Sequence, residues 1–225
     1  MSGPRYWRPV WEAKAPEPEF SASGRSSGDP GQLFALLSDA CRALELSAGD
    51  RLLDLGCGVG LLGRHVAPYV SELVGLDFAV SLLARAHELA PTAHLSAGDL
   101  LRLPFRDGAF SKVLASSVLQ YLDSLDAVSV SLAEMRRVTA QGGRAFASGN
   151  PDLRKKQEYI DGVDRLDLPE ARKQEIRERN RAAFWLSPEA LRDRAQEAGW
   201  KPEIRPISGA VWQSSYMFDL LLTTE

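Results

Sequence analysis

Cysteine, histidine and long apolar runs are scarce in this chain of 225 residues. The two cysteines, Cys41 and Cys57, fit no zinc-ligand spacing and are too few for a disulfide framework. The three histidines form no cluster along the sequence, so no metal site is predicted. No apolar run approaches the roughly 18 residues of a membrane span, and residues 1–20 lack the pattern of a signal peptide. We therefore expect a soluble, reduced, cytoplasmic protein without a membrane partner.

An excess of basic residues is also missing. The formal net charge is −3, which excludes a global positive field and offers no case for a nucleic-acid partner. With 44% hydrophobic and 25% charged residues, the composition is that of an ordinary globular protein. The length suits one well-cored domain, and nothing in the sequence predicts the oligomeric state.

From residue 30 onward, helical and strand patterns alternate. This alternation predicts an α/β fold: a Rossmann-like, seven-stranded, mostly parallel sheet with helices on both faces. Ligands of such sheets bind at the carboxyl ends of the strands. Strands are predicted over 51–55, 72–76, 92–96, 110–115, 144–148, 200–206 and 215–222, and helices over 30–46, 61–66, 79–89, 124–138 and 187–199.

Two segments fall outside this alternation. Residues 1–29 are rich in Pro, Ser and Gly but contain four aromatic residues, which a disordered tail rarely does. We predict an irregular arm that packs over a pocket of the domain formed by residues 30–225. Residues 151–183 hold nine basic and eight acidic side chains at near-alternating spacing, which predicts a solvated helical insertion. Either an exposed helical surface or a substrate lid would account for this insertion.

A glycine-rich turn follows the first predicted strand, in the sequence Leu52-Leu-Asp-Leu-Gly-Cys-Gly-Val-Gly60. Its glycines allow a tight turn and let a ligand approach the backbone. The next helix directs free N–H groups and its positive dipole end at that ligand. A dinucleotide is one candidate, because the glycines from Gly58 to Gly63 fit its fingerprint and Asp77 follows Gly58 by 19 residues.

Acidic residues near the ends of three successive strands favour a different cofactor. These residues are Asp54, Asp77 and Asp99. A dinucleotide site requires no acid at Asp99, and its strand normally runs directly into the first glycine, whereas this strand ends before Gly56. S-adenosylmethionine (SAM) has no phosphate but carries a sulfonium, an ammonium and a ribose diol, which carboxylates and backbone groups suit. The pattern therefore favours SAM.

Five segments, in order, resemble the conserved motifs of class I SAM-dependent methyltransferases. They span roughly residues 48–150, and residues 185–200 resemble the penultimate helix of the small-molecule enzymes of that family. The five segments are Leu-Asp-Leu-Gly-Cys-Gly-Val-Gly at 53–60, Val-Gly-Leu-Asp-Phe at 74–78, Gly-Asp-Leu-Leu-Arg-Leu-Pro-Phe at 98–105, the strand and its exit at 110–121, and Glu-Met-Arg-Arg-Val-Thr-Ala-Gln-Gly-Gly-Arg at 134–144.

The resemblance implies a role for each matching residue in binding SAM and its product S-adenosylhomocysteine. Gly56, Gly58 and Gly60 would line the methionine end of SAM. Asp54 would lie near its ammonium group. Asp77 would accept hydrogen bonds from both ribose hydroxyls, which is a charge-assisted pair.

Further cofactor contacts follow from the later segments. Phe78 would pack on the adenine, whose amino group would meet Asp99 and the backbone of Leu100. Ser116 would lie beneath the sulfonium, although a role as a loop cap suits it equally well.

The acceptor side is less defined by the resemblance. Tyr6, Trp7 and Arg25 precede the first helix, where related enzymes fold a lid over SAM, and an arginine there would pair with the SAM carboxylate. Gln120 and Tyr121 follow the fourth strand, where substrate contacts begin, although ordinary packing is an equal alternative. Tyr121 is the candidate catalytic residue, since no other general base stands out.

These roles predict a SAM-dependent methyltransferase that acts on a small-molecule O, N or C acceptor without a metal. The segment after the fourth strand lacks the Asn/Asp-Pro-Pro-Tyr/Phe pattern of enzymes that methylate exocyclic nitrogens, and no acidic metal cluster of the catechol type is present. A non-catalytic SAM-binding regulatory protein and an NAD(P)-dependent oxidoreductase stay open as alternatives. The sequence does not predict the acceptor.

Overall fold

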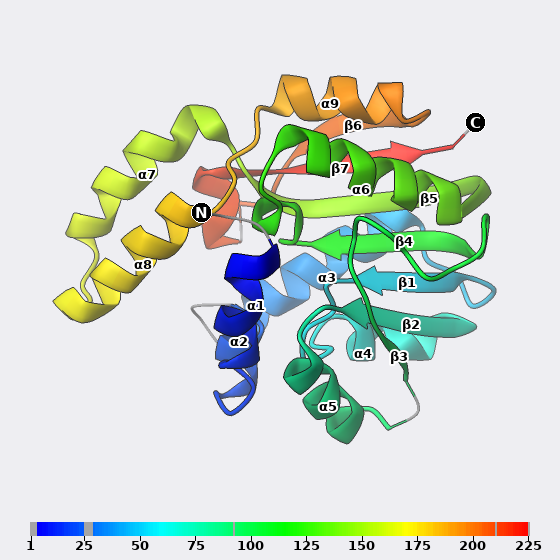
Figure 1. Ribbon diagram of the computed structural model, residues 1–225, viewed down its shortest axis with the longest axis horizontal. Helices are drawn as coiled ribbons and strands as arrows, with labels where there is room; N and C mark the ends of the chain where they lie inside the picture. Colours follow the sequence, from blue (N-terminus) through cyan, green and yellow to red (C-terminus); the bar gives the residue numbers. More distant parts are fainter. Residues whose placement is uncertain (1–3, 25–28, 92, 210, 225) are drawn as a thin grey trace.

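The computed structural model describes residues 4–24, 29–91, 93–209 and 211–224 and centres on a seven-stranded sheet (Figure 1). The strand order is β3-β2-β1-β4-β5-β7-β6. Pairs from β3 through β5 are parallel, and β7 runs antiparallel to both of its neighbours. The predicted mostly parallel sheet is confirmed. The strands are β1 (Arg51–Leu55), β2 (Glu72–Asp77), β3 (His94–Ala97), β4 (Phe110–Ser116), β5 (Thr139–Pro151), β6 (Lys201–Pro206) and β7 (Met217–Thr223).

Helices cover both faces of this sheet. Helices α6 and α9 pack over one face, and α3 and α4 pack over the other. The α-helices are α1 (Pro4–Glu12), α2 (Glu19–Ala22), α3 (Pro30–Leu44), α4 (Gly63–Val66), α5 (Val80–Leu89), α6 (Leu125–Val138), α7 (Lys156–Gly162), α8 (Glu170–Ala182) and α9 (Pro188–Glu197). Short 3₁₀ turns are η1 (Ala67–Tyr69), η2 (Leu119–Tyr121), η3 (Leu153–Lys155), η4 (Val163–Arg165) and η5 (Trp212–Ser215).

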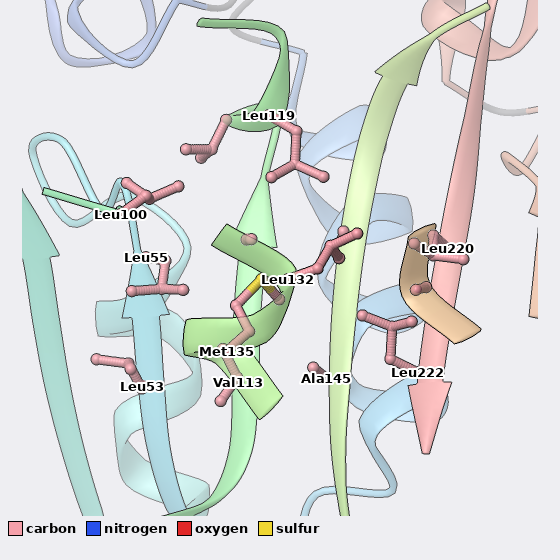
Figure 2. Packing of buried hydrophobic residues seen from close by; sticks show 14 of the residues in the cluster. Leu53, Leu55, Leu100, Val113, Leu119, Leu132, Met135, Ala145, Leu220 and Leu222 are labelled. Carbon is pink, nitrogen blue, oxygen red and sulfur yellow. The ribbon is translucent and has the colours of Figure 1, made fainter. Parts of the chain in front are cut away.

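The central strands are apolar on both faces because helices bury both sides. Figure 2 shows the larger cluster, in which Leu132 and Met135 of α6 lie against Val113 of β4 and Ala145 of β5. On the opposite face, Leu52 and its neighbours pack against α3 and α4. Burial at this scale fixes the register of the strands, and the register in turn fixes where their carboxyl ends lie.

Helix starts follow the capping chemistry of the sequence. Asp29 accepts a hydrogen bond from the Gly31 N–H at 2.9 Å, and Pro30 occupies the first turn of α3. Ser124 caps α6 and Ser187 caps α9 in the same way. These caps explain why helix positions were predictable to within a few residues.

The predicted irregular arm is wrong in one respect, because its described part is largely helical. Helix α1 tolerates Pro9 within it. Trp7 and Trp11 lie one turn apart on α1 and both pack on Tyr121, so tertiary packing outweighs the cost of the proline. A second correction concerns β5, which was predicted over 144–148 but begins at Thr139 and ends at Pro151.

The arm and the insertion meet at the carboxyl end of the sheet. In Figure 1, α1, α2 and α8 lie beside the tips of the parallel strands. The predicted helical character of residues 151–183 is confirmed by α7 and α8, whose apolar residues Ile160 and Ile176 are buried. Among the described residues, none of the helices is long and apolar enough to cross a membrane.

Candidate functional site

A pocket opens at the carboxyl ends of β1, β2 and β4, which is where ligands of such sheets bind. Its space free of protein atoms is about 1130 Å³, part of it open to solvent. Of the residues predicted to bind cofactor or substrate, this pocket brings together Asp54, Gly56, Gly58, Asp77, Phe78, Leu100, Ser116, Gln120 and Tyr121. The prediction therefore converges on one cavity, although the residues come from four separate parts of the chain.

The glycine turn lines one end of the pocket, which we call the glycine end. Gly56 and Cys57 donate backbone hydrogen bonds to the Leu76 carbonyl at 2.7 and 3.1 Å, which ties the turn to β2. Gly56 has φ +65°, and a Cβ there would lie 2.5 Å from a methyl carbon of Val118. Both the dihedral angle and the close approach require glycine at this position. The turn is thus rigid, and its backbone faces the cavity.

Asp77 holds the glycine turn in place. Its Oδ2 accepts the Gly58 N–H at 2.8 Å and its Oδ1 accepts the Ala79 N–H at 2.8 Å. Burial raises the pKa of the carboxyl group, although the N–H donors favour the charged form. Each carboxylate oxygen has a second lone pair, so Asp77 is able to accept hydrogen bonds from a ligand diol as well.

The glycine end of the pocket is negatively charged. Asp54 lies at the end of β1, is buried and lines the cavity. Between Asp54 and Asp77 lies Cys57, whose thiol has a pKa raised well above its ordinary value by burial and by these two carboxylates. A cationic ligand is therefore favoured at this end, and the thiol stays protonated.

The exit of β4 forms the neighbouring wall. The Ser116 hydroxyl accepts a hydrogen bond from Ser148 at 3.0 Å, and Ser117 adopts a left-handed conformation with φ +57°. Gln120 is buried and donates to the Ser117 carbonyl at 3.1 Å. The backbone carbonyl of Gln120 accepts a hydrogen bond from the Phe184 N–H at 2.8 Å. This bond joins the chain directly after the insertion to this wall.

The arm closes the pocket from another side. Trp11 lines the cavity and packs edge-on against Tyr121, with ring centroids 5.2 Å apart. Glu12 accepts hydrogen bonds from the N–H groups of Val80 and Ser81, both at 2.8 Å, and so caps α5. The arm is therefore anchored to the helix that follows Asp77.

Some predicted residues do not reach the cavity. Gly60 shapes the turn with φ +75° but does not line the pocket, and Asp99 accepts the Leu101 N–H within its own loop. Tyr6 is 39% exposed, while Trp7 is 1% exposed and packs behind Tyr121 at 4.9 Å. Each of these residues thus takes part in a turn, a loop or a packing contact and does not form part of the pocket wall. The predicted Arg25 lies outside the described residues.

Comparisons with known proteins agree with this geometry. Residues 53–147 match the family model of the methyltransferase domain. A demethylmenaquinone methyltransferase of Beutenbergia cavernae is 36% identical over 102 residues, which cover 45% of this chain and 41% of that protein. A malonyl-[acyl-carrier protein] O-methyltransferase of Serratia marcescens is 32% identical over 127 residues, covering 55% of this chain and 49% of that protein. Residues 53–147 are thus similar to a methyltransferase domain, and the sheet that contains them has the class I methyltransferase fold.

This fold extends beyond the matched segment. A chain of the Haloferax volcanii complex between the Trm112 methyltransferase activator and a methyltransferase shares it with a TM-score of 0.70 at 16% identity, over 95% of this chain and 97% of that one. The chain spans about half the length of the curated relatives it matches. The family model ends within β5, before the insertion.

Sequence reasoning missed much of the pocket wall that lies away from the glycine turn. The spacing of Trp7 and Trp11 was a usable signal for a helix that packs one face on the domain. Arg179 had none, because it stands within a run of charges that looks uniformly solvated. The missed lining residues away from the glycine turn are Trp11, Ala22, Ser23, Gly24, Arg179, Asn180, Ala183, Gln213, Tyr216 and Met217.

Metal ligands do not gather in the described part of the chain. No group of three or more His, Cys, Asp or Glu side chains is placed there to hold a metal ion. Among the pocket residues with a resolved shift, burial raises the pKa of Tyr216 well above its ordinary value. Tyr216 is thus a neutral phenol near pH 7.

Proposed function

We propose that the chain binds SAM in this pocket and transfers its methyl group to a small-molecule acceptor. The observation that carries the proposal is the buried Asp77 carboxylate beside the glycine turn, with both oxygens aligned by backbone N–H groups. Such a preorganised acceptor suits the ribose diol of SAM, because hydrogen bonds to an ionised group are the strong ones. The negative glycine end suits the sulfonium and ammonium charges.

The residues divide the cofactor between them in this proposal. Gly56 and Gly58 leave room for the methionine end, with Asp54 near its ammonium group. Asp77 holds the ribose, and Phe78 and Leu100 flank the adenine. All six of these residues line the pocket.

In this proposal, catalysis depends on the alignment of the acceptor with the methyl group and on the exclusion of water from the pocket. When bound, SAM supplies an activated methyl group, whose bond to sulfur breaks as the bond to the acceptor atom forms, leaving S-adenosylhomocysteine. Ser116, Gln120 and Tyr121 border the space where the acceptor must lie in line with that group. The arm and α8 exclude water from it. An acceptor with a high pKa also needs a base, for which Tyr121 is the residue at hand.

Binding of S-adenosylhomocysteine by titration calorimetry tests the cofactor, with NADH titrated in parallel. We expect micromolar binding of S-adenosylhomocysteine and none of NADH. Asp77→Ala weakens binding at least tenfold, whereas Asp193→Ala, on the exposed face of α9, leaves it unchanged. Unfolding temperatures of both variants separate loss of the site from loss of the fold.

The outcomes distinguish the alternatives. No binding of S-adenosylhomocysteine, or equal binding by a folded Asp77→Ala variant, removes the proposal. Binding of NADH alone supports the oxidoreductase alternative. Binding of S-adenosylhomocysteine without turnover of any acceptor in a broad screen with labelled SAM supports a regulatory SAM-binding protein.

A further inference from the structure

The pocket wall built by the arm, α8 and η5 contains polar atoms that the fold itself leaves unpaired. Trp11 Nε1 and Gln213 Oε1 are buried and have no hydrogen-bond partner among the described residues. Both residues line the cavity. Because buried polar atoms in native proteins are nearly always hydrogen-bonded, an unpaired donor and an unpaired acceptor here point to a polar ligand.

Arg179 brings a positive charge to the same wall. Its guanidinium group has no ion pair or side-chain hydrogen bond within the described ranges, although the residue is half-buried and lines the pocket. By contrast, Arg177 of the same helix is paired with Asp164 and Glu170. A guanidinium offers a planar set of donors that matches a carboxylate, so a half-buried one that faces a cavity invites an anion.

No anion of the described pocket wall competes for Arg179. The acids that line the cavity are Asp54 and Asp77, and both are engaged at the glycine end. The charge of Arg179 lowers the pKa of the Tyr159 and Tyr216 hydroxyls, but burial outweighs it and raises the pKa of both. These phenols are neutral near pH 7, so the positive charge of Arg179 is available to a ligand.

The surroundings of Arg179 are aromatic. The rings of Tyr159 and Tyr216 lie 4.0 Å apart between centroids, and Tyr216 faces the cavity. Trp11 and Tyr121 form another pair at 5.2 Å. Aromatic walls favour a planar, apolar partner that packs by stacking or edge-on contact.

We propose that this wall is the acceptor subsite of the methyltransferase and that it takes an aromatic acid. The ring packs among Trp11, Tyr121 and Tyr216, and the carboxylate pairs with Arg179. Gln213 Oε1 accepts a hydrogen bond from a hydroxyl or amino substituent. This inference rests on the proposed function and names the class of its acceptor.

Paired probes test the charge requirement in the protein saturated with S-adenosylhomocysteine. Benzoate, 4-hydroxybenzoate and 1-hydroxy-2-naphthoate are each compared with their methyl esters, and binding is followed by quenching of tryptophan fluorescence and by calorimetry. We expect at least one acid to bind tenfold or more tightly than its ester. Raising the salt concentration reduces this preference only modestly, because the pair is partly desolvated.

Variants of α8 assign the preference to one residue. Arg179→Gln removes the discrimination between acid and ester, and Arg179→Lys retains part of it because the charge stays. Arg181→Gln is the matched control, since Arg181 lies two residues away and is exposed. Binding of S-adenosylhomocysteine is unchanged in all three variants.

The two proposals fail in different ways. If wild-type protein does not bind S-adenosylhomocysteine, the proposed function fails first. If it does bind, equal affinity for acids and esters, or no binding of any acid, overturns the subsite. A loss of S-adenosylhomocysteine binding in Arg179→Gln also overturns it, because Arg179 would then pair with the cofactor carboxylate.

Discussion

The two ends of the pocket are built in different ways. At the glycine end, the turn after β1, Asp77 at the end of β2 and Ser116 at the end of β4 come from strands that are adjacent in the sheet. At the acceptor end, the wall comes from α1, η2, α8 and η5, which are far apart in the sequence. The first end depends on backbone geometry, and the second depends on side chains from separate segments.

This difference separates what the fold constrains from what it allows to vary. Backbone N–H groups and positive φ angles at the glycine end leave little freedom for substitution. Side chains at the acceptor end tolerate change as long as their elements stay anchored. Cofactor binding is therefore expected to respond mainly to changes at the glycine end, and stability and acceptor choice to changes elsewhere.

The largest expected effect is that of Gly56→Ala. A left-handed conformation costs an L residue about 1–2 kcal/mol, and the new methyl group would meet Val118 at 2.5 Å. We expect affinity for S-adenosylhomocysteine to fall at least a hundredfold in calorimetry. Gly49→Ala is the control, since a Cβ there meets nothing within 4 Å and φ is not positive. Unchanged binding by Gly56→Ala would remove the claim that this end depends on backbone geometry.

A buried carboxylate behind the acceptor end gives the next effect. Asp219 accepts the Gly149 N–H at 2.8 Å, and burial raises the pKa of its carboxyl group to about 6. Because this pKa lies above the unfolded value, the stability it confers is complete below about pH 4 and is lost as pH rises through 6. The difference corresponds to at most about 3 kcal/mol.

The Asp219→Asn variant isolates this contribution. In chemical unfolding between pH 4 and pH 7, wild-type protein loses stability relative to the variant as pH rises. Asp193→Asn, exposed on α9, is the control and follows wild type. Parallel curves for wild type and Asp219→Asn would show that the carboxyl group titrates normally.

A smaller effect is expected where the arm is anchored. Hydrogen bonds from Ser81 and Val80 hold the pKa of Glu12 below its ordinary value. A lowered pKa stabilises the fold above the unfolded pKa, and this contribution is lost as pH falls through the folded one. Glu12→Gln should therefore cost about 1 kcal/mol at pH 7 and less at acid pH, where the wild-type carboxyl group becomes protonated.

Tryptophan fluorescence reports this change, because Trp7 and Trp11 lie on the same helix as Glu12. Glu158→Gln on α7, where the glutamate is exposed, is the matched control. An equal loss of stability at both pH values would contradict the role of the charge.

The smallest effect is expected for Tyr6→Ala. Tyr6 is 39% exposed and touches Trp7 edge-on at 5.0 Å, but it does not line the pocket. We expect a cost of about 0.5 kcal/mol in stability and no change in affinity for S-adenosylhomocysteine. A tenfold loss of that affinity would restore Tyr6 to the cofactor site and blur the comparison between the two ends.

Much of the fold was predictable because periodicity and capping are local signals. The strand over 51–55 and the helix that begins after Ser124 were placed nearly as the structure has them. The helix in the arm was not predicted, since the prolines there suggested irregular backbone. This helix is stabilised by the contacts of Trp7 and Trp11 with Tyr121, which are not local in the sequence. Asp99 was predicted to contact the cofactor, but it does not line the pocket. Its carboxylate instead accepts a hydrogen bond within its own loop.

The sequence by itself determined the parallel sheet, the glycine turn and the meeting of Asp54 and Asp77 at one edge, because consecutive parallel strands bring their carboxyl ends together. Only the tertiary structure decided which side chains form the acceptor wall. Arg179 and Trp11 lie 168 positions apart in the sequence and share one cavity, and no local pattern encodes that contact. Their meeting depends on how α1 and α8 dock on the sheet, which is a property of packing between distant segments.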